Sequence, residues 1–162
     1  MRKNLTLSLA AVLAMLGTAA YGATTTSTFQ TRITIQATCI IVSASTLDFG
    51  TQGVLSANVD QTSTLQVQCT NTTPYNIGLD AGTGSGSTVT TRKMTSGANT
   101  INYSLYSDSA RTTNWGNTVG TDTVAATGTG ASVSHTVYGR VPAQSTPAPA
   151  TYTDTVTVTV TY

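Results

Sequence analysis

The sequence has 162 residues, a formal net charge of +1 and only 8% charged residues. With so few charges it has neither a basic face nor an acidic tail, which argues against a nucleic-acid partner bound through many phosphate contacts. Threonine, serine, glycine and alanine dominate, and no stretch after Leu16 has helical periodicity. This composition favours strands and turns, so the sequence predicts an all-β domain.

The first 22 residues have the features of a secretory signal peptide. A short basic head precedes an apolar run at residues 5–16, and small residues follow. We expect cleavage after Gly22, with Ala20 as the alternative. The apolar run is too short to span a bilayer, so we expect no membrane insertion. Removing residues 1–22 leaves 140 residues with a net charge of −1, enough for one domain with a core.

Six segments alternate apolar and polar residues, which is the period-2 pattern of half-buried strands. Turn and loop residues separate them, with a spacing that suggests a β-sandwich. The segments lie at residues 28–39, 64–69, 75–80, 101–108, 131–141 and 151–162. Shorter apolar pieces at 47–50 and 92–94 are candidates for partial strands. An immunoglobulin-like sandwich needs seven strands, and only six long ones are clear.

The first and last segments raise the question of what pairs with them. The last one ends the chain with strict alternation, with five residues on its apolar face: Tyr152, Val156, Val158, Val160 and Tyr162. The first places another apolar series on one face: Phe29, Thr31, Ile33, Ile35, Ala37 and Cys39. This segment either pairs within its own domain or is a free arm that completes a different molecule.

Two cysteines, Cys39 and Cys69, are present. In an exported chain they meet an oxidising environment, so we predict a disulfide between them rather than free thiols. Closing a loop of about 30 residues stabilises a fold by roughly 3–4 kcal/mol on the chain-entropy estimate. A metal pair is disfavoured because the sequence has one histidine to complete such a site, and we expect no metal or cofactor.

Several residue types could carry chemistry, and for each of them a structural role is the stronger interpretation. His135 could act as a catalytic base only beside a nucleophile. The sequence has no G-x-S-x-G nucleophile elbow, since residues 82–86 read GTGSG. That glycine-rich loop also lacks the spacing and the lysine of a phosphate cradle. Six aspartates are scattered at strand ends and turns, where Asp is a turn former: Asp48, Asp60, Asp80, Asp108, Asp122 and Asp154.

Aromatic residues and one arginine leave further alternatives open. Trp115, with Tyr106 and Tyr138, could stack on a sugar ring, although roles in the core or in contact with another molecule are favoured. Arg32 lies on the polar face of the first segment, where it either pairs with a neighbouring molecule or is a solvated charge.

A succession of motifs covers nearly all of the chain after the signal peptide. In order, these are Cys39, LDFG (47–50), VQC (67–69), YNIGLDAG (75–82), RKM (92–94), INYSLYSD (101–108), WG (115–116), VYGRVPAQ (137–144) and YTDTVTVTVTY (152–162). In this combination the chain resembles the spore coat protein U domain family, which includes the archaic, Csu-type chaperone–usher pilins.

The resemblance implies an incomplete immunoglobulin-like β-sandwich of six strands plus an N-terminal donor arm. In such pilins a periplasmic chaperone lends the missing strand, and the arm of the next subunit replaces it at an outer-membrane usher. The chain then divides into a signal peptide (1–22), a donor-strand arm (23–37) and a pilin domain (38–162). The donor residues would be Phe29, Thr31, Ile33 and Ile35. They would enter an acceptor groove along the C-terminal strand, at Val156, Val158, Val160 and Tyr162.

The function implied is that of a structural subunit, not an enzyme. The chain would be exported through the periplasm into a cell-surface pilus that supports adhesion and biofilm formation. Its partners would be the chaperone, the usher, other copies of itself and sibling pilins. The alternative is a secreted, self-contained β-sandwich that binds a sugar or a surface, whose arm pairs within its own domain. A small periplasmic enzyme is a third candidate, disfavoured because no catalytic constellation is evident.

Overall fold

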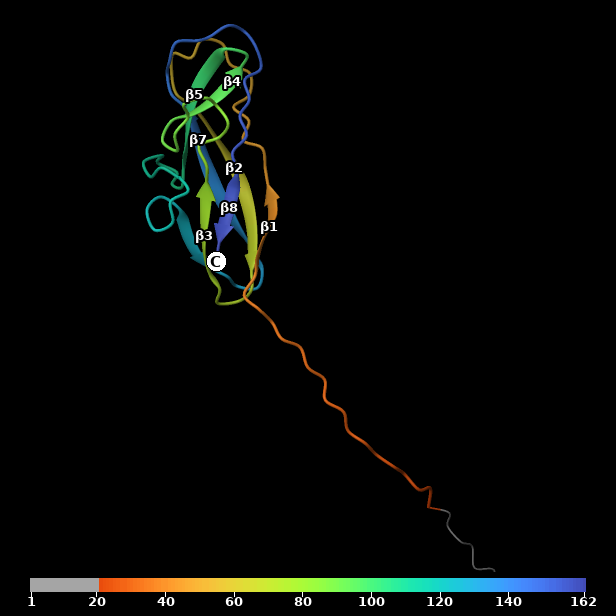
Figure 1. The fold of residues 1–162 in the computed structure, drawn as a ribbon. Coiled ribbons are helices and arrows are strands. Elements are labelled where there is room, and N and C mark those ends of the chain that lie inside the picture. Colours follow the sequence, from red (N-terminus) through yellow and green to blue (C-terminus); the bar gives the residue numbers. More distant parts are fainter. Residues whose placement is uncertain (1–20) are drawn as a thin grey trace, which may run out of the picture. The chain divides into compact units, whose positions relative to one another are not determined.

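The computed structural model describes residues 21–162, which contain eight β-strands and no helix. Five strands form one antiparallel sheet in the order β1-β2-β7-β5-β4. Their bounds are β1 Cys39–Ala44, β2 Val59–Cys69, β4 Arg92–Ser96, β5 Asn99–Tyr106 and β7 Ser132–Val141. A second sheet has the order β6-β3-β8, with β3 Pro74–Leu79, β6 Val124–Thr127 and β8 Val158–Thr161. This two-sheet, all-β architecture (Figure 1) confirms the predicted fold class.

The chain divides into two units, residues 1–34 and residues 35–162. The predicted signal peptide lies outside the described residues, except for Tyr21 and Gly22. In the first unit, residues 21–34 have no strand and are exposed. The second unit contains all eight strands. The boundary between arm and domain at residues 37 and 38 stays a prediction.

The core is built from the inward residues of both sheets. Alternate side chains of β2, β3, β5 and β7 are buried, which confirms the faces predicted for four of the six segments. Apart from Cys69, the buried apolar residues of these strands are Leu65, Val67, Tyr75, Ile77, Leu79, Tyr103, Leu105, Val137 and Val141. Trp115 joins them at 1% exposure and donates its indole N–H to the carbonyl of Ile77 at 2.8 Å. A buried tryptophan of this kind is a core residue, so it offers no face to a sugar.

The structure corrects the predicted strands in several places. Segment 28–39 contains no strand before Cys39, and the partial strand expected at 47–50 is absent. The piece at 92–94 does belong to a strand, β4, whereas β6 covers residues that the sequence pattern assigned partly to a loop at 126–130. Alternation did not identify β1, because its sequence CIIVSA contains three consecutive apolar residues, nor β6, because it has only four residues.

The C-terminal strand is shorter than the predicted 151–162. Its alternation is real, since every second side chain from Tyr152 to Val160 is half-buried. Strand pairing with β3, however, runs only from Leu79 opposite Val158 onward. Before that point the segment has one isolated bridge, between Thr95 and Thr153. Alternation predicts which face is buried, but a ladder also needs a neighbouring strand of matching length.

Cys39 and Cys69 form the predicted disulfide. The two residues are direct partners in the antiparallel register of β1 and β2. Thr38 extends this pairing, because its carbonyl accepts from the Thr70 N–H at 2.9 Å. The bond therefore fixes the start of β1, the point where the N-terminal segment joins the sandwich.

We predict that replacing both cysteines by alanine lowers the free energy of unfolding by about 3–4 kcal/mol, because the unfolded chain then gains the entropy of an open loop. Urea unfolding followed by the fluorescence of Trp115 measures this loss. A reducing agent should shift the unfolding midpoint of the original chain and leave the double variant unchanged. Equal midpoints for the original chain and the double variant would contradict the prediction.

Candidate strand-acceptor groove

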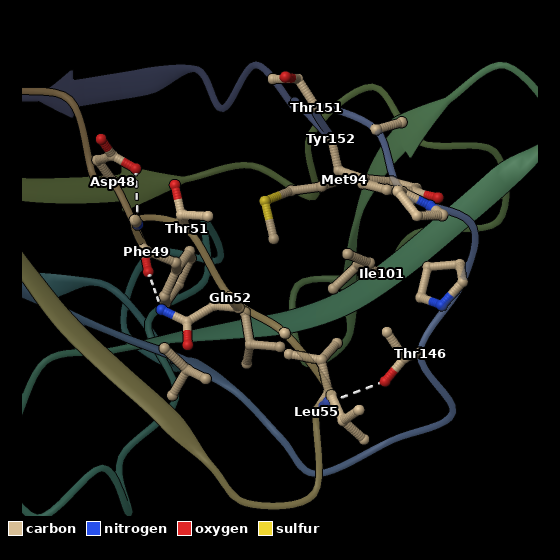
Figure 2. Close-up of a pocket in the computed structure, with 18 of the residues that line it drawn as sticks. Asp48, Phe49, Thr51, Gln52, Leu55, Met94, Ile101, Thr146, Thr151 and Tyr152 are labelled. Atoms are coloured by element: carbon tan, nitrogen blue, oxygen red, sulfur yellow. Dashed lines mark hydrogen bonds between the residues drawn. The ribbon is translucent and has the colours of Figure 1, made fainter.

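One side of the sandwich is open along two adjoining cavities. The first, of about 700 Å³, lies between residues 47–55 and 146–152 (Figure 2). The second, of about 470 Å³, lies between residues 44–49 and 151–158. The two cavities share lining residues: Leu47, Asp48, Phe49, Met94, Thr151 and Tyr152. We call the combined surface the open groove.

The floor of the open groove is the hydrophobic core itself. Side chains from both sheets line the second cavity: Leu65, Leu79, Tyr103, Leu105 and Val137. In the first cavity, Figure 2 shows Phe49, Met94 and Ile101 directed toward the enclosed space. A sandwich core normally ends at a strand that covers it on each side. Here the cavities open from the surface to the apolar interior. The groove can therefore accommodate a row of apolar side chains from one face of an additional strand.

The rims of the second cavity lead to two strand edges. β1 is one of the two outer strands of the five-stranded sheet, β8 is one of the two outer strands of the three-stranded sheet, and β1 and β8 lie near each other (Figure 1). Each strand pairs with one neighbour, β1 with β2 and β8 with β3. Within residues 21–162, no strand is paired with the remaining edge of either. Such edges are templates for an additional strand.

The free edge of β8 presents the backbone of its valines. Thr157 uses its carbonyl to accept from the Asp80 N–H at 3.1 Å, so the threonine backbone faces β3. Residues of an antiparallel pair alternate between bonded and non-bonded positions. Val156, Val158 and Val160 therefore direct their N–H and C=O groups toward the open edge, while their half-buried side chains pack against the core.

The edge of β1 is apolar and irregular. By the same alternation, the bonded pair of Thr38 and Thr70 leaves the backbone groups of Cys39 and Ile41 facing away from β2. A register shift between Ile41 and Ser43 then interrupts the ladder. Three consecutive side chains in this strand are about half exposed: Ile40 at 54%, Ile41 at 42% and Val42 at 48%. This much exposed aliphatic surface beside a free edge is unusual for a closed sandwich.

Hydrogen bonds hold the wall of the groove formed by residues 151–157. Asp154 accepts from the Tyr103 hydroxyl at 2.8 Å and from the Thr83 N–H at 2.7 Å. Burial raises the pKa of Tyr103, as does its bond to Asp154, so the phenol stays protonated and acts as the donor. Thr95 and Thr153 exchange backbone bonds at 2.8 and 3.1 Å. The wall is thus fixed by the domain itself.

Asp80 holds the same wall where β8 approaches. Its carboxylate accepts from the Thr157 N–H at 2.8 Å and from the Gly82 N–H at 2.9 Å. Burial acts to raise the pKa of Asp80, but the bonds from Thr157 and Gly82, with the charge of Arg92, outweigh it and lower the pKa below its usual value of 3.8. The carboxylate form is therefore the one that ties β8 to the end of β3.

A fully buried arginine supports this region from behind. The guanidinium of Arg92, at 0% exposure, donates to four backbone carbonyls at 2.7–2.9 Å: those of Leu79, Asp80, Val89 and Trp115. Burial lowers the pKa of Arg92, but a guanidinium stays charged in proteins. Because the contacts to the carbonyls of Leu79 and Trp115 are buried, where an unpaired carbonyl is costly, Arg92 fixes the end of β3 that Asp80 follows.

Some of the predicted site residues line the open groove or pack against the core, and the others are exposed. Val156 and Val158 line the second cavity, and Val160 is packed against the core below it. Tyr162 is 59% exposed and lies beyond the end of β8. In the arm, Phe29, Ile33 and Ile35 are 88%, 82% and 72% exposed, and Thr31 is also exposed. Their roles as donor and acceptor residues stay predictions.

The sequence patterns did not predict the side of the groove that lies across from residues 151–158. Leu47 and Phe49, which line both cavities, come from the LDFG motif, noted only as a possible partial strand. Met94, Ile101 and Tyr152 were assigned to strands, without a role in the groove. The alternation of Ile101 with Tyr103 and Leu105 was a usable signal for an inward face. The position of the loops around these residues was not visible in any local pattern.

The alternative chemical sites have structural roles here. His135 Nε2 lies 3.0 Å from the Tyr75 hydroxyl, and burial lowers the pKa of His135. The carboxylate of Asp60 pairs with Arg140, with both bonds at 2.7 Å, so this aspartate is not a turn former. Within the described residues, no three His, Cys, Asp or Glu side chains gather as metal ligands, and no helix could cross a membrane.

Comparisons with known proteins agree with this fold. The profile of the Spore Coat Protein U domain matches residues 25–159. Protein U of Myxococcus xanthus is 34% identical in an alignment of 158 residues that covers 88% of each chain. A crystal structure of the CsuC-CsuE chaperone–tip adhesion subunit pre-assembly complex, from archaic chaperone-usher Csu pili of Acinetobacter baumannii, matches with a TM-score of 0.55 and 24% identity. That match covers 80% of this chain and 40% of the solved chain.

The geometry of Asp80 leads to a prediction about pH. Because its pKa is lowered in the folded chain, its contribution to stability is present above pH 3.8 and is lost as the pH falls through the lower, folded value. We expect D80N to be less stable than the original chain at pH 7 and to lose less stability below about pH 4. Urea midpoints between about pH 2.5 and 7 test this, and an equal acid dependence in both proteins would refute it.

Proposed function

This chain belongs to the spore coat protein U domain family, and we propose that it is a structural subunit of a surface pilus, polymerised without covalent bonds by donor-strand exchange. The observation that carries the proposal is the open groove, an apolar cleft into the core that is flanked by the free edges of β1 and β8. A single additional strand would cover the cleft and pair with both edges. Donor-strand complementation between chaperones and pilins is a form of this β-strand addition.

The N-terminal arm supplies a strand of the required pattern. Its apolar face consists of Phe29, Ile33 and Ile35, with Thr31 between them, and all four residues are exposed. Burying each large apolar side chain in the groove is worth roughly 1.5–3 kcal/mol. Backbone bonds to the free edges add about 1 kcal/mol each. The gain is large enough to hold subunits together without a covalent link.

The donor is expected to come from another molecule. To fill its own groove directly, the arm would have to reverse immediately before β1 in a tight hairpin. Such hairpins need Gly, Asn or Asp at positions of positive φ, and residues 33–39 read ITIQATC. Thr38 is in addition already bonded to Thr70 in the ladder of β1 and β2. These features favour exchange between copies over the self-contained sandwich of the alternative function.

A subunit with an unfilled groove needs temporary cover after export. Exposed aliphatic residues beside a free strand edge promote aggregation. In the proposed pathway a periplasmic chaperone lends a strand to the groove, and an outer-membrane usher exchanges it for the arm of the next subunit. The assembled fibre would lie at the cell surface, where it supports adhesion and biofilm formation. The structural role leaves no need for a catalytic site.

We predict that a charge on the inner face of the arm prevents polymerisation. I33D should abolish fibres because it places a carboxylate in the apolar groove, whereas the neighbouring outward variant T34D should still polymerise. Deletion of residues 23–36 should give a chain that binds its chaperone but cannot donate a strand. Electron microscopy of the assembled product is the readout. Normal fibres from I33D or from the deletion would overturn the donor assignment.

We also predict that the chain depends on a chaperone in the periplasm. Expressed alone, most of it should aggregate or be degraded, because the open groove has no cover. Coexpression with the matching chaperone should yield a soluble one-to-one complex, visible by size-exclusion chromatography with light scattering. A stable, soluble monomer without any chaperone would instead favour the self-contained binding module.

A further inference from the structure

The predicted arm and the open groove carry opposite charges. Residues 23–37 contain one charged side chain, Arg32. The residues that line the two cavities include two carboxylates, Asp48 and Asp154, and no lysine or arginine. In a chain with only 8% charged residues, this complementarity is confined to very few groups. It points to a specific contact between the arm of one copy and the groove of another.

The two carboxylates differ in the number of hydrogen bonds that they accept within the domain. Asp154 accepts from Tyr103, from Thr83 and from the Thr155 N–H, so its charge serves the wall of the groove. Asp48 is exposed, and among the described residues its partner is the Gly50 N–H, at 2.8 Å from Oδ1. The second oxygen of Asp48 can therefore accept from an incoming guanidinium without a loss of existing bonds.

Arg32 and Asp48 both belong to the outer side of the proposed joint. Asp48 lines both cavities, which places it where they join, on the rim formed by residues 47–50 (Figure 2). Arg32 adjoins Ile33 in the arm and has the opposite parity. When Ile33 points into the groove, Arg32 therefore points outward, toward the rim and solvent.

Resting on the proposed function, we propose that Arg32 of the donating copy pairs with Asp48 of the accepting copy and sets the register of the inserted arm. An arm of alternating residues can slip by two positions and still bury apolar side chains. Such a slip displaces Arg32 by about 6.6–6.8 Å, which separates it from Asp48. The ion pair forms in one register only, whereas the apolar side chains of the arm can be buried in more than one.

A charge-swap experiment tests the pair, because every joint between identical copies contains both residues. The exported chain, purified as its chaperone complex and then allowed to exchange strands, is compared with R32Q, D48N, R32D, D48R and the double variant R32D/D48R. D48N keeps an oxygen for the Gly50 N–H, so it removes the charge while preserving the local turn. T62D, an exposed position on β2 that lines neither cavity, controls for added charge. Self-assembly is followed by light scattering and electron microscopy.

We expect the neutral variants to assemble about 1.4- to 5-fold more weakly, the range measured for exposed ion pairs. The single reversals R32D and D48R should be weaker still because like charges then meet at every joint, and the double variant should recover to within about two-fold of the original chain. These differences should shrink at about 0.5 M NaCl, where charges are screened.

Two kinds of failure are separable. If R32D and D48R assemble like the original chain and T62D, or if the double variant is weaker than either single variant, the ion pair is refuted while donor-strand exchange stands. If I33D also assembles normally, the arm is not the donor and the proposed function itself fails.

Discussion

Two free strand edges of this sandwich, those of β1 and β8, border the same opening into the hydrophobic core, and this constraint shapes most other features of the domain. Leu65, Leu79 and Leu105 are almost fully buried, yet they form the floor of a cavity that reaches the surface. The backbone of the valines at positions 156, 158 and 160 faces the same opening. A strand inserted there would satisfy the edge hydrogen bonds and cover the apolar floor at once.

The groove is held open by the domain's own polar contacts. Asp80 and Asp154 fasten residues 153–157 to the loop after β3 and to β5, and Thr95 pairs with Thr153. Arg92 secures the end of β3 through four carbonyls. A preformed site reduces the ordering cost that an incoming strand must overcome. Few charged residues are present, and those in this region maintain the groove, with Asp48 left available at its rim.

Much of the fold could be predicted from local patterns. Alternation identified the buried faces of β2, β3, β5 and β7, and export predicted the disulfide between Cys39 and Cys69. Strand lengths could not be predicted in the same way. Residues 151–162 alternate throughout, but only Val158–Thr161 are paired with β3. The rim at Leu47 and Phe49 was not assigned to the groove, because loops that border a cavity carry no periodic signal of their own.

The sequence by itself determined which side chains turn inward, because the direction of a side chain along an extended backbone depends only on its parity. It also determined the family and the apolar pattern of the arm. Only the tertiary structure decided that β1 and β8 each lie at an edge of their sheets, and that both border one opening. Edges and cavities arise from pairings between residues far apart in the chain, so no local pattern contains them. The acceptor side of the proposed joint is for that reason a property of the folded domain.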